Sequence, residues 1–227
     1  VIFRFFNDHV ATIEEMSLVN TRPIGQGGGA AVIEGASVTF NAVAMEQHDG
    51  TGRPAAVLFG FRDASIALNS CFVAENASGE FGSAIIADAS GSGSISILNT
   101  VFANNSGGER REIIDVRGDR DFGIVNTTFA NNGTPFAVSA QASTPAQLAN
   151  VVSDVPLLTS NSIALTSNSV FPGATGNNID AEPSFADAAN GDYTLLPGSP
   201  GVDLGDPVAF TDAGGGDVDI LGNPRIV

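Results

Sequence analysis

The stretch SISILNTVFANN occupies residues 94–105, and three other parts of the chain are versions of it. They read SVTFNAVAMEQ at 37–47, SIALNSCFVAEN at 65–76 and FGIVNTTFANN at 122–132. Each contains an asparagine that follows an apolar residue, and successive asparagines lie 28, 30 and 27 residues apart. A repeat of nearly constant length indicates a stack of equivalent units, because stacked units bury the apolar side chains that one unit leaves exposed.

Short apolar runs and sharp corners alternate within each unit. Runs such as AAVI at 30–33 and AAVLF at 55–59 follow stretches containing glycine, which permits the positive φ angles of tight corners. No segment sustains the apolar period of an amphipathic helix. Short strands wound in one direction lie side by side in parallel. The sequence therefore predicts an all-β fold: a single-stranded parallel β-helix (solenoid) over residues 1–176, right-handed because of strand twist.

The repeated asparagines are Asn41, Asn69, Asn99 and Asn126. We expect them to lie in register along the solenoid axis, one per coil, at a bend of the chain. Two structural roles remain open. Their amides form a ladder that satisfies backbone groups at the corner, or asparagine is used because it tolerates the left-handed conformation. Neither role makes these residues catalytic.

The charge balance is strongly acidic. The chain has 25 acidic and 9 basic residues, a net charge of −16, and every basic residue is an arginine. Such a surface repels phosphate backbones and anionic membranes, so we expect no nucleic-acid partner. The absence of any run of 18 apolar residues predicts no membrane-spanning segment. The only cysteine, Cys71, is expected to be a small core side chain.

Residues 177–227 differ from the repeats and are rich in Asp, Pro and Gly. They predict an irregular C-terminal cap that packs on the last coils and shields the open end of the solenoid. Within it, Asp212, Asp217 and Asp219 flank a glycine turn and offer oxygen ligands for Ca²⁺, the one cofactor that we consider. Their spacing departs from that of an EF-hand loop. A solvated acidic surface without a specific ligand is the alternative interpretation.

Two patterns carry a family resemblance. NIDAEPSFADAANGDYTLLPGSPGVDLGD at 178–206, followed by TDAGGGDVDILGNPR at 211–225, resembles the C-terminal signature of the choice-of-anchor Q proteins. The run GQGGGAAVI at 25–33 resembles coils of the same group. That family belongs to the pectate-lyase-like, right-handed parallel β-helix proteins and is similar to polymorphic outer-membrane and other bacterial surface proteins. The resemblance implies a β-helix and an exported, surface-associated bacterial setting, and it implies no particular activity.

One charged cluster lies inside the repeats, at 109–112 and 115–121. Its candidate groove residues for a carbohydrate or protein partner are Asp115, Arg117, Asp119 and Arg120. Acids mixed with arginines on one coil are typical of a carbohydrate groove or a lyase site, and mutual neutralisation of charges at a corner is the alternative. Lyases need a base beside a bound cation, and hydrolases need paired carboxylates. We assign no catalytic residue.

The sequence favours a non-enzymatic, secreted or cell-surface β-helix. As a structural or adhesive module it would belong to a surface layer, a filament or a larger assembly, with self-assembly, polysaccharide or other surface proteins as its interactions. A polysaccharide lyase or glycoside hydrolase on the same fold is the alternative. Convergence of carboxylates from adjacent coils in a groove would favour the enzyme.

Overall fold

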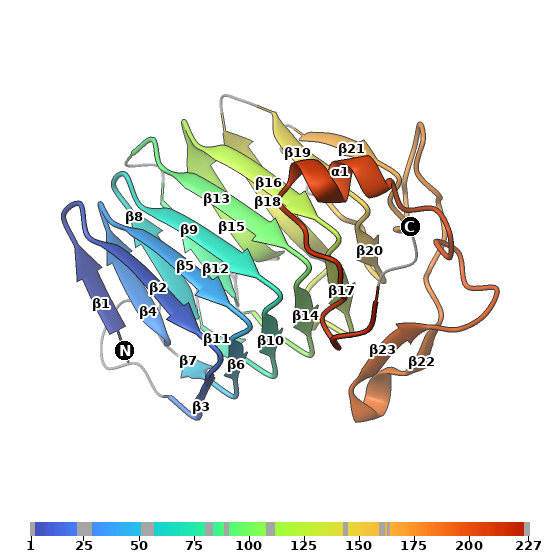
Figure 1. Ribbon diagram of the computed structural model, residues 1–227, viewed down its shortest axis with the longest axis horizontal. Helices are drawn as coiled ribbons and strands as arrows, with labels where there is room; N and C mark the ends of the chain where they lie inside the picture. Colours follow the sequence, from blue (N-terminus) through green and yellow to red (C-terminus); the bar gives the residue numbers. More distant parts are fainter. Residues whose placement is uncertain are drawn as a thin grey trace.

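Three parallel sheets, here called A, B and C, form the body of the molecule (Figure 1). The computed structural model describes residues 3–21, 29–50, 57–79, 84–88, 91–107, 112–142, 145–158, 162 and 164–224. The chain visits sheets A, B and C in turn and then returns to A, so that successive coils stack along one axis. The fold is a parallel β-solenoid of about five turns, which confirms the all-β repeat architecture expected from the sequence.

The strands are short, and each sheet takes one strand from each coil. Sheet A contains β1 (Phe3–Phe6), β4 (Ala31–Glu34), β8 (Leu58–Phe61), β12 (Ile85–Ala87), β15 (Glu112–Gly118) and β18 (Phe136–Ala142). Sheet B contains β2 (Val10–Glu14), β5 (Ser37–Asn41), β9 (Ser65–Asn69), β13 (Ser94–Leu98), β16 (Asp121–Val125), β19 (Ala146–Ala149) and β21 (Ala164–Ser167). Sheet C contains β3 (Ser17–Val19), β6 (Ala44–Glu46), β10 (Phe72–Ala74), β14 (Val101–Ala103), β17 (Thr128–Ala130) and β20 (Val152–Ser153).

The remaining elements are small. β7 (Asp49–Gly50) pairs in parallel with β11 (Ala77–Ser78) after sheet C. β22 (Phe185–Asp187) and β23 (Asp192–Leu195) form an antiparallel hairpin around the 3₁₀ turn η1 (Ala188–Asn190). α1 (Pro207–Asp212) is capped at its N-terminus by Asp206, whose side chain accepts a hydrogen bond from the Val208 backbone N–H. Proline is well tolerated at such a first helical position.

Apolar side chains of equivalent strands stack inside the coils. Phe40, Leu68, Ile97 and Ile124 are register partners in sheet B, and each is at most 1% exposed. In sheet C the rings of Phe102 and Phe129 stack at a centroid distance of 5.1 Å. Burial of each such side chain contributes roughly 1.5–3 kcal/mol. The strands alternate between this core and the surface, so each sheet also presents an outward face.

The repeated asparagines at the corner between sheets B and C do not form the single column that the sequence predicted. Asn41 pairs with Asn69, but Asn69 pairs with Leu98, so Asn99 lies one position further along its coil. Asn99 and Asn126 have φ of 51° and 50°, whereas the two earlier coils place non-asparagine residues at this left-handed position. The four asparagines thus occupy two adjacent columns. Asn69 and Asn99 are 30 residues apart, whereas register partners on β9 and β13 are 29 residues apart.

Amide contacts between coils exist in both columns. In the first, Asn69 Nδ2 donates to Asn41 Oδ1 at 2.9 Å. In the second, Asn99 Nδ2 donates to Ser70 Oγ at 3.0 Å, and Asn150 Nδ2 donates to Asn126 Oδ1 at 2.7 Å. Bonding between coils and left-handed backbone therefore occur together at Asn99 and Asn126.

A second asparagine ladder, at the corner after sheet C, is buried and was not identified from the sequence. Asn76 Nδ2 donates to Asn105 Oδ1 at 2.8 Å, and Asn105 Nδ2 donates to Asn132 Oδ1 at 3.1 Å. The same two amides also reach the carbonyls of Met45 and Val73 in the preceding coils, at 3.0 and 2.8 Å. The sequence pattern that indicates this ladder is the asparagine that ends three of the repeats. These three asparagines are 29 and 27 residues apart. This ladder satisfies backbone groups that the corner removes from water.

The C-terminal segment lies along the side of the solenoid. α1 lies over the end of sheet B, near β19 and β21 (Figure 1). Tyr193 and Ile220 pack on the outward face of sheet C, against the small cluster that contains Ala74 and Val101. The Tyr193 hydroxyl accepts a hydrogen bond from Asn104 Nδ2 at 2.9 Å. The segment therefore covers parts of two sheet faces.

Coil-like pairing extends past the expected boundary at residue 176. Val152 forms a parallel bridge with Val170, and Val170 forms another with Ile179. Asn178 Oδ1 accepts a hydrogen bond from the Ser169 backbone N–H at 3.1 Å. The first residues of the predicted cap thus continue the stack before the chain turns along its side.

Candidate functional site

Several residues of the charged cluster that was expected to form a groove are buried in the fold. Asp115 and Arg117 lie on β15, and the guanidinium binds the carboxylate through Nε–Oδ1 at 3.0 Å and Nη2–Oδ2 at 2.9 Å. Asp115 is fully buried, although it lies on the outward face of sheet A. Its register partners Ile86 and Ser139 are 5% and 1% exposed. The carboxylate of this pair is therefore buried, whereas the Arg117 side chain is 32% exposed.

Arg120 is also buried, at 1% exposure. Its guanidinium donates to the backbone carbonyls of Ala64 and Asp88, at 2.7 Å from Nη1 and 3.0 Å from Nη2, and it also reaches the Arg62 carbonyl. Burial lowers the pKa of Arg120, while the carboxylates of Asp63 and Asp88 oppose this shift. The side chain ties three coils together at the corner between sheets A and B.

Asp115 and Arg120 are therefore buried within the coils, and a groove at this cluster stays a prediction. Asp119 is exposed beside Arg120. Glu112 is buried, and residues 109–111 of the cluster lie outside the described residues.

The three aspartates expected to bind calcium are separated by their local structure. Asp212 ends α1, whereas Asp219 Oδ1 accepts hydrogen bonds from the backbone N–H groups of Leu221 and Asn223, at 2.9 and 2.8 Å. Asp217 lines a hollow beside α1. Over the described ranges, no three His, Cys, Asp or Glu side chains are grouped as metal ligands would be. Calcium binding stays a prediction.

Two further buried titratable side chains, Cys71 and His48, have perturbed pKa values. Burial raises the pKa of Cys71 to about 11, and the thiol donates to the Phe40 carbonyl at 3.3 Å. A thiol of this kind remains protonated and is not nucleophilic. Burial lowers the pKa of His48 to about 4, although the Leu18 carbonyl favours the charged form. His48 Nδ1 contacts Thr21 Oγ1, and its backbone N–H donates to Asn76 Oδ1 at 3.0 Å.

His48 therefore begins the buried ladder. The Asn76 backbone N–H donates to Asn105 Oδ1 in the same way, at 3.2 Å. A neutral imidazole thus occupies the position that asparagine holds in the next coils. Its role is structural.

The outward face of sheet B is a different kind of surface. Ser37, Ser65 and Ser94 stand at successive coils, followed by Asp121. A second column, two residues further along each strand, contains Thr12, Thr39, Ala67, Ser96, Gly123, Gln147 and Leu165. Thr12, Thr39, Ser96 and Gln147 supply polar side chains, and Ala67, Gly123 and Leu165 do not. Equivalent positions recur about every 4.8 Å. The face therefore carries short polar groups at several coils, with apolar residues or glycine at the others.

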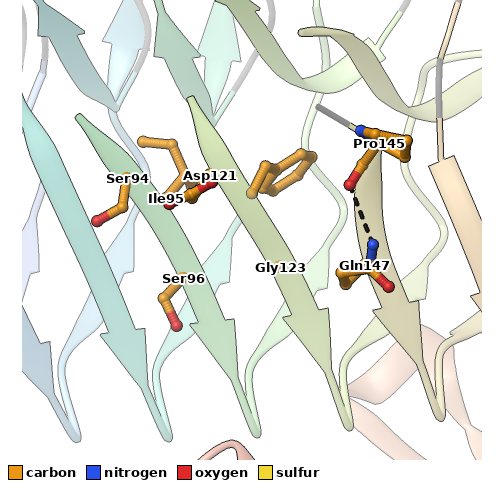
Figure 2. Close-up of a pocket in the computed structure, with 8 residues that line it drawn as sticks. Ser94, Ile95, Ser96, Asp121, Gly123, Pro145 and Gln147 are labelled. Atoms are coloured by element: carbon orange, nitrogen blue, oxygen red, sulfur yellow. Dashed lines mark hydrogen bonds between the residues drawn. The ribbon is translucent and has the colours of Figure 1, made fainter. Parts of the chain in front are cut away.

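This face is hollowed where β13, β16 and β19 lie side by side (Figure 2). A shallow hollow of about 340 Å³ is bordered by Ser94 and Ser96, with Asp121 on the next strand and Gln147 beyond it. Gln147 Nε2 donates to the Pro145 carbonyl at 3.2 Å, which holds the amide at the rim.

Two further hollows lie toward the C-terminal segment, and the three hollows together are called the groove. The second, about 310 Å³, shares Gln147 with the first and is mostly apolar, with Leu165 and Ala149 against Ala209 of α1. The third, about 490 Å³, lies between α1 and the corner of the last coils. It is lined by Asn126, Asn150, Asp203, Gly205, Asp206, Pro207, Phe210, Thr211, Gly215, Gly216 and Asp217.

The C-terminal wall of the groove is held by two asparagines, Asn150 and Asn168. Asn150 Oδ1 accepts from the Asp206 backbone N–H at 2.7 Å, and its Nδ2 donates to the Asp206 carbonyl at 2.8 Å. Asn168 Nδ2 also donates to the Leu204 carbonyl at 3.1 Å. The corner column that joins the coils thus also holds the C-terminal segment in place. Sequence reasoning missed this groove because its walls come from segments that are far apart in the chain.

Comparison of the chain with protein-family models, with curated proteins and with solved structures finds no match. The fold is therefore established by the structure alone, and the surface-protein family remains a resemblance of sequence patterns. Within the described part of the chain, no helix has the length and apolar character needed to cross a membrane.

Proposed function

We propose that this chain is a structural or adhesive module of a secreted or cell-surface bacterial protein, and that it binds an extended polysaccharide along the outward face of sheet B. The observation that carries the proposal is the series of serine and threonine side chains on the outward face of sheet B, which Ala67 and Gly123 interrupt and which extends across the coils to the groove. A surface that repeats at each coil suits a ligand that repeats along its own length. The rigid stack supports a load-bearing or surface-layer role.

The groove has the chemical groups that this ligand class requires. Ser94, Ser96 and Gln147 supply hydroxyl and amide groups for hydrogen bonds to sugar hydroxyls. Leu165 and Ala149 supply an apolar floor for the carbon faces of a sugar ring. Binding sites commonly combine apolar walls with a few polar groups that fix orientation. The strongly acidic composition and the resemblance to surface proteins support an extracellular setting.

Affinity electrophoresis in gels that contain neutral, amino and uronic acid polysaccharides tests this proposal. Ser96→Leu fills the first hollow and is expected to abolish the retardation of the wild-type chain. Ser17→Leu is the matched control, because Ser17 is an exposed serine on β3 in sheet C. Circular dichroism verifies that both variants fold.

Equal retardation of the wild type and both variants, or retardation of none, would contradict the proposal. The same polysaccharides are assayed for new reducing ends and unsaturated products. Product that Ser96→Leu removes would favour the polysaccharide lyase or glycoside hydrolase alternative.

A further inference from the structure

The charged residues that line the groove are all acidic. Asp121 borders its first hollow, and Asp203, Asp206 and Asp217 line the third. Among the described residues that line the three hollows there is no arginine, lysine or histidine. The whole chain, at −16, strengthens this negative potential. Charge complementarity across a binding surface selects partners, because like charges brought together cost free energy.

Two acidic walls of the third hollow are held in place before any ligand arrives. The wall that carries Asp203 is fixed by the double hydrogen bond between Asn150 and the Asp206 backbone. The wall that carries Asp217 packs against α1 at Gly215. The ring of Phe210 in α1 lies 2.3 Å from the position where a Cβ at Gly215 would stand, so the ring occupies the space of a side chain. A site with fixed walls loses little conformational entropy on binding.

The carboxylate of Asp206 has a structural task, whereas the other two are exposed. Asp206 Oδ1 accepts from the Val208 backbone N–H at 2.9 Å and caps α1. Asp203 and Asp217 are exposed at the hollow. These two side chains are therefore accessible from the hollow.

We propose that the groove selects a polysaccharide that carries amino groups. One protonated amino sugar occupies the third hollow near Asp203 and Asp217, and the neighbouring sugars lie along the polar side chains of sheet B. An ammonium group donates three hydrogen bonds and is attracted by both carboxylates. A uronic acid at the same place is repelled by them. This inference rests on the proposed function, since it names the ligand class of the same groove.

Isothermal titration with three matched oligosaccharides tests the inference at low ionic strength: glucosamine oligomers, N-acetylglucosamine oligomers and galacturonate oligomers. The wild type is expected to bind the glucosamine oligomer most tightly, with an affinity that falls as salt rises. In the double variant Asp203→Asn and Asp217→Asn, the Kd for that ligand is expected to rise about three- to tenfold, as for the loss of exposed ion pairs. The Kd for the N-acetylated oligomer is expected not to change.

The control is the double variant Asp8→Asn and Glu14→Gln, which removes the same number of charges on the first coil. Asp203 and Asp8 both have positive φ, a conformation that asparagine tolerates, so neither replacement strains the backbone. The control is expected to bind the glucosamine oligomer as the wild type does. An equal loss in both double variants would overturn the inference, because the overall charge and not the hollow would then be responsible.

Two further outcomes separate this inference from the function on which it rests. If the N-acetylated or galacturonate oligomer binds as tightly as the glucosamine oligomer, and Ser96→Leu abolishes that binding, the polysaccharide function stands and the selectivity is wrong. If no oligosaccharide binds, both are wrong.

Discussion

The buried imidazole of His48 predicts a loss of stability in mild acid. The side chain is 3% exposed, and its burial lowers its pKa from about 6.5 to about 4. The unfolded chain therefore takes up a proton at His48 below about pH 6.5, whereas the folded chain resists protonation until about pH 4. The stabilising contribution is complete above about pH 6.5 and falls as the pH decreases to 4.

The magnitude follows from the shift. A difference of about 2.5 pKa units at about 1.36 kcal/mol per unit gives about 3 kcal/mol between pH 7 and pH 4. Carboxylates also titrate in this range, and burial raises the pKa of Glu46 and of Asp154. The contribution of His48 must therefore be measured as a difference between two variants that share every carboxylate.

His48→Asn supplies that comparison, because asparagine occupies the equivalent position in the next coils and bonds the carbonyl of the preceding coil. Urea unfolding at pH values from 4 to 7 gives the free energy of unfolding of each protein. His48→Asn is expected to match the wild type within about 1 kcal/mol at pH 7 and to exceed it by about 3 kcal/mol at pH 4. His9→Asn, which replaces the exposed histidine, controls for the loss of an imidazole. Parallel curves for His48→Asn and the wild type would refute the argument.

Three further predictions concern the ladders and the C-terminal acids. Asn105→Ala is expected to lower the free energy of unfolding by about 2–4 kcal/mol, because it leaves buried partners unpaired. The control is Asn104→Ala at the neighbouring position, which is expected to cost about 1 kcal/mol. Equal losses of the two variants in urea unfolding would contradict this prediction. Asn99→Leu is expected to cost about 1–3 kcal/mol, since leucine is strained at a φ of 51°, and Asn99→Gly less; the reverse order would disprove backbone strain as the cause. If calcium binds the C-terminal acids, a chelator lowers the Tm and Asp217→Ala removes that effect, with a stabilisation of about 2.7 kcal/mol at a hundredfold ligand excess; identical melting curves would leave only a solvated acidic surface.

The candidate site was less predictable than the fold. Asp115 and Arg120 were expected in a groove because their charges stand together in the sequence, yet Arg120 reaches the Ala64 carbonyl, 56 residues away, and is buried there. Nothing local in the sequence distinguishes a charge that faces solvent from one that faces the carbonyls of another coil. Two of the three hollows of the groove lie instead between α1 and the last coils, which are far apart in the sequence.

The sequence by itself determined the repeat, the coil length and the apolar columns, because each coil buries its side chains only against copies of the same pattern. It also determined that asparagine belongs at the corners, although the register of Asn99 against Ser70 depended on how the 29 residues of that coil were wound. Only the tertiary structure decided which polar side chains are buried, which column of asparagines bonds the backbone, and where the C-terminal segment lies. These depend on hydrogen bonds between residues one or more coils apart, whose directions the order of residues does not specify.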